Sequence, residues 1–151
     1  MIKLTDRPDI SGSVKASNRY QQFAGLLRAI DETKLTRDTL DLVDQEIEAL
    51  NAVPSEAKHF SRAIKTRETQ VIRILEKRHK IVPRNYYRKL WMLLGMSAFG
   101  TPVGVTLGSS TGNMAFLGLG IGIGMAVGMA VGTKMDKKAF EEGRQLDFEV
   151  K

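Results

Sequence analysis

The side chains that could carry acid–base or metal chemistry in this chain of 151 residues are few and far apart. The two histidines, His59 and His79, do not form a paired-ligand motif, and the absence of cysteine excludes a thiolate metal site. Gly118, Gly120 and Gly122 have the spacing of a nucleotide-binding loop, but no strand pattern precedes them and no charge surrounds them. We therefore predict no metal and no cofactor.

One arginine–histidine pair has a spacing that is also found in enzymes. Arg73 stands six positions before His79 in "RILEKRH", which resembles the Arg-x4–6-His signature of HEPN ribonucleases. The resemblance implies action on an RNA phosphodiester, although the residue after the arginine is usually polar in that family and is Ile74 here. The alternative is a basic helix that contains a histidine. We adopt the alternative and predict that the chain is not an enzyme.

Charge is absent from one long segment of the chain. Residues 90–133 contain no Asp, Glu, Lys, Arg or His, and they form two apolar runs, 90–108 and 114–133, around the polar turn "SSTGN". At 1.5 Å per residue each run spans about 28–30 Å, which matches the hydrocarbon core of a bilayer. The pattern predicts a transmembrane helical hairpin within 83–133. A soluble hairpin is the alternative, and it would need other helices to cover it on all sides.

Glycine repeats at every fourth position in both runs. The first run has a row of Gly100, Gly104 and Gly108, and the second has a row of Gly120, Gly124, Gly128 and Gly132. A further row, about 200° away on the second helix, contains Gly118, Gly122, Ala126 and Ala130. In lipid, small residues let helix backbones approach closely. We predict that one row of the second helix joins the two spans and that the opposite row contacts another copy of the chain.

A family resemblance accompanies these rows. The run "GLGIGIGMAVGMAVGT", followed by the lysine-rich "KMDKKA", resembles the small bacterial glycine-zipper membrane proteins over about residues 95–140. The resemblance implies oligomerisation in a membrane and implies no reaction.

Positive charge is concentrated beside the apolar runs. Residues 58–89 hold eleven basic and two acidic side chains. Nine flanking cations are predicted to contact anionic lipid headgroups: Lys77, Arg78, Lys80, Arg84, Arg88, Lys89, Lys134, Lys137 and Lys138. The positive-inside rule then places both termini in the cytoplasm, with the chain in the inner (cytoplasmic) membrane. Tyr86, Tyr87 and Trp91 are predicted to form an interfacial aromatic belt.

The first span contains a proline and three hydroxyl groups. Pro102 removes a backbone donor and predicts a kink. Ser97, Thr101 and Thr106 either bond backbone groups near that kink or face a polar lumen. The second interpretation would make the first span the lining of a pore.

The remaining residues predict an all-α fold. Residues 17–82 show three helical patterns, the second acidic and the third basic, which favours an antiparallel pair with complementary charge. The third pattern ends near residue 82 and carries Arg67 and Arg78 on its apolar stripe. Residues 1–16 are expected to be flexible, and 134–151 to form a cytoplasmic tail.

These patterns predict an integral membrane protein that homo-oligomerises through its glycine hairpin. It would display cytoplasmic helical domains as an anchor or scaffold for a protein partner. Two alternatives stay open: an oligomeric pore lined by the first span, and a membrane-bound protein whose basic stretch 58–89 binds anionic lipid or RNA.

Overall fold

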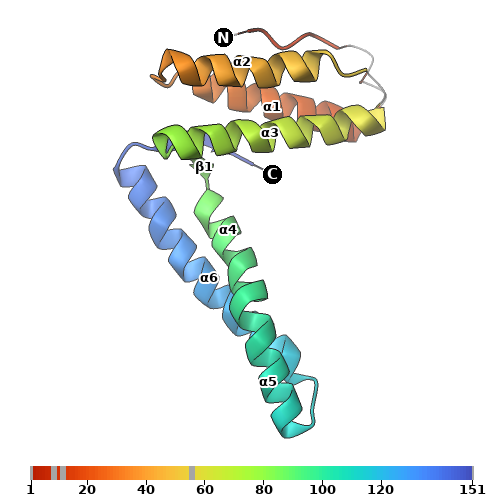
Figure 1. Cartoon of the computed structure of the whole chain (residues 1–151), viewed down its shortest axis with the longest axis vertical. Helices are drawn as coiled ribbons and strands as arrows, with labels where there is room; N and C mark the ends of the chain where they lie inside the picture. The colour runs from red at the N-terminus through yellow and green to blue at the C-terminus, as the bar shows by residue number, and fades with distance from the viewer. Residues whose placement is uncertain (1, 8–9, 11–12, 55–56, 151) are drawn as a thin grey trace. The chain divides into compact units, whose positions relative to one another are not determined.

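A computed structural model describes residues 2–7, 10, 13–54 and 57–150, and the chain divides into two compact units (Figure 1). The first unit, called the helical domain below, comprises Met1–Pro83 and Leu146–Lys151. The second unit, called the hairpin, comprises Arg84–Gln145. Helices make up most of both units, which confirms the all-α prediction in its coarse form.

The helical domain contains three helices: α1 (Val14–Asp31), α2 (Arg37–Asn51) and α3 (Ala57–His79). Helix α3 packs against both of the others. Each helix buries an apolar stripe at helical spacing, and these stripes form the core: Phe23, Leu26, Leu27, Ile30, Val43, Ile47, Leu50, Phe60, Ile64, Val71 and Leu75. The Ser13 hydroxyl caps α1 by accepting from the Ala16 N–H, so this helix begins three residues earlier than the pattern predicted.

Helices α2 and α3 form the predicted antiparallel pair. Arg67 of α3 donates to Glu46 of α2 at 2.9 Å, which gives the half-buried guanidinium a carboxylate partner. Near the start of α2, the buried Thr39 hydroxyl lies 2.9 Å from Nε2 of His79 at the end of α3. Pairing of the start of one helix with the end of the other sets their opposite directions. Arg78, the other basic residue predicted on the apolar stripe, is exposed.

Helix α3 ends at His79, and the prediction that it continues to residue 82 is wrong. Lys80 has a left-handed backbone with φ 57°, which stops the helix. Val82 precedes Pro83, and the proline ring disfavours a helical conformation for the residue before it. Residues Val82–Arg84 instead form the strand β1.

The last residues of the chain also depart from a simple tail. Gln145–Glu149 form β2, which pairs with β1 in a two-stranded sheet. Val82 and Leu146 bury their side chains, so the sheet adds to the apolar core of the domain. Short strands of this kind give no long alternating pattern, which is why helical periodicity did not predict them.

The first residues of the chain have defined partners. The Thr5 N–H donates to the side chain of Asn51, and the Tyr20 hydroxyl donates to the Thr5 carbonyl. Arg7 donates to the carbonyls of Val53 and Asn51 at 2.6 Å, and its guanidinium lies 4.5 Å from the ring centroid of Phe60. Residues 2–7 are thus bonded to the helices, and residues 14–16 belong to α1, which differs from the expected flexible segment 1–16. Residues 1, 8–9 and 11–12 of that segment lie outside the described part of the chain.

The hairpin contains two long helical segments. The first, Tyr86–Thr111, consists of α4 (Tyr86–Leu94), the π-helical turn η2 (Gly95–Gly100) and α5 (Thr101–Thr111). The second is α6 (Phe116–Glu141). The chain reverses at Gly112, whose φ of 68° favours glycine, and the Asn113 side chain accepts from the Ala115 N–H. The turn therefore lies later than the predicted 109–113, because Ser110 and Thr111 bond the carbonyls one turn back within α5.

Candidate helix-packing site

The glycines of the two hairpin helices meet backbone to backbone. A Cβ atom at Gly104 would lie 2.8 Å from Cα of Leu117, and one at Gly124 would lie 2.7 Å from Cα of Gly100. Both distances are shorter than real Cβ contacts allow. Further along α6, a Cβ atom at Gly128 would likewise collide with the backbone of Trp91, and one at Gly132 with the backbone of Arg88. We call this surface the inner glycine row: Gly120, Gly124, Gly128 and Gly132 of α6, facing Gly95, Gly100 and Gly104. Gly108, the other predicted member of the first row, instead faces Asn113 and Met114 in the turn.

Gly95 belongs to this contact although it does not fit the spacing of four. It precedes Gly100 by five residues, and the intervening turn is π-helical, with bonds between residues five apart. The Thr101 N–H accordingly donates to the Met96 carbonyl. The wider turn brings both glycines to the same face. The π-helical turn ends two residues before Pro102, the residue at which a kink is predicted.

The opposite row of α6 is open. A Cβ atom at Gly118 or Gly122 would meet nothing within 4 Å. Ala126 and Ala130, the next members of this row, are exposed. We call Gly118, Gly122, Ala126 and Ala130 the outer small row. The two rows of one helix therefore differ: the inner row is filled by the partner helix, and the outer row has no neighbour among the described residues.

A buried carboxylate continues the inner glycine row. Asp136 follows Gly132 by four residues and is 7 % exposed. Its two oxygens accept from the Tyr87 N–H at 3.0 Å and the Arg88 N–H at 2.9 Å. These amides belong to the first turn of α4, where backbone N–H groups find no acceptor within the helix, and the preceding residue, Asn85, provides no side-chain cap. Asp136 thus caps α4 from α6 and complements the positive end of its dipole.

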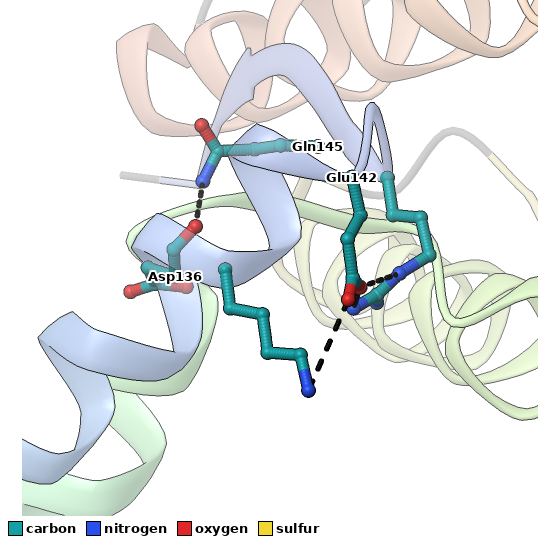
Figure 2. A network of polar contacts seen from close by, with 5 residues as sticks. Asp136, Glu142 and Gln145 are labelled. Atoms are coloured by element: carbon teal, nitrogen blue, oxygen red, sulfur yellow. Dashed lines mark hydrogen bonds and ion pairs between the residues drawn. The ribbon is translucent and has the colours of Figure 1, made fainter.

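Sequence reasoning missed Asp136, although a signal existed. The four-residue row Gly120 to Gly132 has Asp136 as its next member, so the carboxylate had to share the face of the glycines. Near it, Gln145 Nε2 lies 3.4 Å from the Asp136 carbonyl, and Glu142 accepts from Arg144 (Figure 2). The bond from Arg144 is the main reason that the pKa of Glu142 is lowered.

Large apolar side chains cover the outside of the hairpin. Both helical segments are long and apolar enough to cross a membrane. In their most apolar stretches of 18 residues, only 17 % and 22 % of the residues are buried. Phe99 is 62 % exposed and Leu93 60 %. Other exposed large apolar residues of the hairpin are Leu90, Leu94, Val103, Val105, Leu107, Met114, Leu119, Ile123, Val127, Val131 and, near the end of α6, Phe140. A core helix of a soluble protein would bury such residues.

The three hydroxyl groups of the first span bond within their own helix. Ser97 donates to the Leu93 carbonyl at 3.0 Å, Thr101 to Met96 at 3.1 Å and Thr106 to Pro102 at 2.9 Å. This arrangement matches the local interpretation, in which the hydroxyls satisfy backbone acceptors near the proline.

The flanks of the hairpin combine exposed cations with partly buried aromatic rings. All nine cations predicted to contact headgroups are exposed. Tyr87 is only 9 % exposed and packs edge to face with Tyr86, with 5.3 Å between ring centroids. Trp91 is half-buried. Tyr87 therefore contributes to helix packing in addition to its position at the end of the apolar segment.

The arginine and histidine of the nuclease-like pattern point in different directions. Six residues rotate a helix by about 600°, which separates Arg73 and His79 by about 120° around α3. Arg73 is exposed, whereas His79 bonds the Thr39 hydroxyl. Within the described residues no group of three His, Asp or Glu side chains could hold a metal ion.

No family model matches this chain, and no curated protein or solved structure shows significant similarity to it. Its function must therefore be inferred from its own residues.

Proposed function

We propose that the chain is an integral membrane protein whose hairpin spans the bilayer and anchors the helical domain to it. The supporting observation is the inverted packing of the hairpin, with glycine inside and large apolar side chains outside. In water this surface would favour aggregation, whereas in lipid it needs no further cover. The length of the two helices, 26 residues each, exceeds the roughly 20 that a span requires.

Charge at the two ends supports one orientation. Arg84, Arg88, Lys89, Lys134 and Lys137 lie at the open end of the hairpin, while the turn at 112–115 carries no charge. The positive-inside rule favours a cytoplasmic location for the open end, and hence for both termini and the helical domain. The bacterial inner membrane follows as a proposal from the resemblance to glycine-zipper proteins.

Self-association through the outer small row completes the proposal. Helix association in lipid gains little from large apolar groups and more from close backbone approach, which small residues allow. The outer small row has this composition and is open. An oligomer would display several copies of the helical domain, which suits an anchor or scaffold for a cytoplasmic protein partner. The pore alternative gains no comparable support, because the hydroxyls of the first span bond their own helix.

Insertion and orientation are tested by labelling single cysteines in the naturally cysteine-free chain. In sealed cells, Ser110→Cys should react with a membrane-impermeant maleimide added outside. Asp41→Cys and Glu141→Cys, both at exposed positions, should react only after permeabilisation. Labelling of all three from outside, or release of the protein by alkaline carbonate, would contradict the anchor.

Self-association is tested by the size of the complex in mild detergent. Gly122→Leu adds a side chain to the outer small row and should reduce the size of the complex. Val127→Leu, at a position 55 % exposed outside both rows, is the matched control and should leave it unchanged. An unchanged size for Gly122→Leu would exclude this row as the interface.

A further inference from the structure

The exposed face of α3 carries positive charge along most of its length. Arg62, Arg73 and Lys77 are exposed and recur with Thr66 and Thr69 at intervals of three and four residues, so they share one face. Lys65, also exposed, borders this face. We call Arg62, Lys65, Arg73 and Lys77 the basic face. They extend over roughly 22 Å of helix at 1.5 Å per residue.

Glu68 lies about 120° from Arg62 around α3, whereas Glu76 lies on the basic face, between Lys65 and Thr69. Glu68 is 7 % exposed and accepts from Gln22 of α1. Glu76 lies 3.8 Å from Lys80, one turn further along. The ion pairs shown for α3 are those of Arg67 with Glu46 and of Glu76 with Lys80, and the four cations of the basic face are exposed to solvent.

The domain also has a surface of opposite charge. Helix α2 exposes Asp38, Asp41 and Glu48 and has a single basic residue, Arg37, at its start. The cations of α3 and the carboxylates of α2 therefore lie on different helices of one domain. Such a separation of charge orients a domain in the field of a charged surface.

The basic face contains a hollow lined by cationic and polar side chains, which could bind a phosphate group. A shallow hollow of about 260 Å³ is lined by Arg62, Lys65, Thr66, Thr69 and Gln70. Two cations at its rim can pair with a phosphodiester oxygen, as lysine and arginine do with phosphate in general.

We propose that the basic face docks on anionic lipid headgroups of the membrane that holds the hairpin. This inference rests on the proposed membrane anchor. Only residues 80–85 separate the end of α3 from the start of α4, and six residues extend at most about 20 Å. The tether limits the distance between the end of α3 and the start of α4, and the negative potential of the cytoplasmic leaflet attracts cations that come within a Debye length of about 8 Å. Because the hairpin holds the domain at the membrane, the effective concentration of headgroups exceeds that of a freely diffusing nucleic acid.

A fluorescent label on α3 can report contact with headgroups. The full chain with Thr69→Cys carries one bimane label and is reconstituted in vesicles that contain a headgroup spin-labelled lipid as quencher. In vesicles with phosphatidylglycerol, quenching should be roughly twofold stronger than in pure phosphatidylcholine. The difference should vanish in about 1 M salt, where the Debye length is only about 3 Å. Asp41→Cys, on the acidic surface of α2, is the matched control and should show no such difference.

Charge removal sharpens the test. Arg62→Gln, Arg73→Gln and Lys77→Gln, combined in the Thr69→Cys chain, should abolish the response to phosphatidylglycerol while helicity is retained, because all three side chains are exposed. Equal quenching in both lipids before charge removal would overturn the proposal. Protection of the label by added RNA in place of anionic lipid would also overturn it. Carbonate extraction of the same vesicles separates the two proposals: a protein that is retained but shows no anionic response fails only this inference.

Discussion

The helical domain and the hairpin use opposite kinds of residues for their interiors. The domain buries large side chains such as Phe23 and Phe60 and exposes charged ones. The hairpin buries glycines such as Gly124 and exposes large side chains such as Phe99. In water, apolar burial drives folding, whereas lipid gives no comparable reward for burying an apolar side chain and favours close backbone contact. This contrast between the two interiors is what the proposed membrane anchor leads us to expect.

The largest expected difference in stability comes from replacing one phenylalanine by alanine in each unit. Phe60→Ala leaves a cavity in the helical domain and should cost about 3–5 kcal/mol of its stability. Phe99→Ala, at a position that is 62 % exposed in the hairpin, should leave helix pairing nearly unchanged. Hydrogen exchange measured by mass spectrometry on the full chain reports α1–α3 and α4–α6 separately. If Phe99→Ala reduced the protection of α4–α6 as much as Phe60→Ala reduces that of α1–α3, the two interiors would not differ as described.

The next effect distinguishes the two rows of α6. Gly124→Leu places an isobutyl group against the backbone of Gly100 and should force the hairpin helices apart, at a cost of about 1–3 kcal/mol or more. Gly122→Leu adds the same group where nothing lies within 4 Å and should leave the pair intact. The distance between spin labels at Val103 and Leu119 measures the separation. An unchanged distance in the Gly124→Leu protein would show that the inner row does not hold the helices together.

These glycine positions illustrate what the sequence can predict. Repeats of four residues predicted that Gly120 and Gly124 share a face and that Gly122 lies on the other side, because helical geometry depends only on spacing. Spacing could not choose which row meets the first span. Spacing also left out Gly95, since the π-helical turn that aligns this residue with Gly100 departs from the fixed period of 3.6.

In the helical domain, too, sequence periodicity predicted some features and not others. The stripe that contains Phe60 and Ile64 could be predicted from its period. The end of α3 could not, because it depends on the left-handed Lys80 and on the pairing of β1 with a strand more than sixty residues later. The cap from Asp136 to the first turn of α4 is likewise a contact between distant residues. Local patterns predicted the helices, whereas the two strands and the cap of α4 depend on bonds between distant residues.

Asp136 is the polar exception in the glycine contact, and its removal should have an intermediate effect. Asp136→Ala leaves the Tyr87 and Arg88 amides without their acceptor and should cost about 1–2 kcal/mol, as for other lost helix caps. Asp136→Asn keeps one acceptor oxygen and should cost less. Faster hydrogen exchange in a peptide that contains residues 87 and 88 is the expected readout. Glu141→Ala, exposed on the same helix, is the control, and an equal effect of both alanine variants would exclude a specific cap.

The smallest expected effect concerns Glu68, a buried carboxyl group in the helical domain. Burial raises its pKa above the ordinary value of 4.5, and hydrogen bonding from Gln22 and the nearby charges of Arg19 and Lys65 offset only part of this rise. The folded state therefore holds the proton more tightly than the unfolded state. The resulting stability is fully present below about pH 4.5 and is lost as pH rises through the raised pKa.

Glu68→Gln should remove this pH dependence, because an amide keeps an acceptor oxygen for Gln22 but does not titrate. Relative to wild type, the variant should gain up to about 1 kcal/mol at neutral pH, and the gain should shrink as the medium is acidified. Thermal unfolding of the full chain in detergent, followed by far-UV circular dichroism at several pH values, measures the difference. Glu48→Gln, at an exposed site on α2, should not change with pH relative to wild type. A Glu68→Gln protein that is less stable than wild type at neutral pH would mean that the paired charges of Arg19 and Lys65 outweigh the cost of burial.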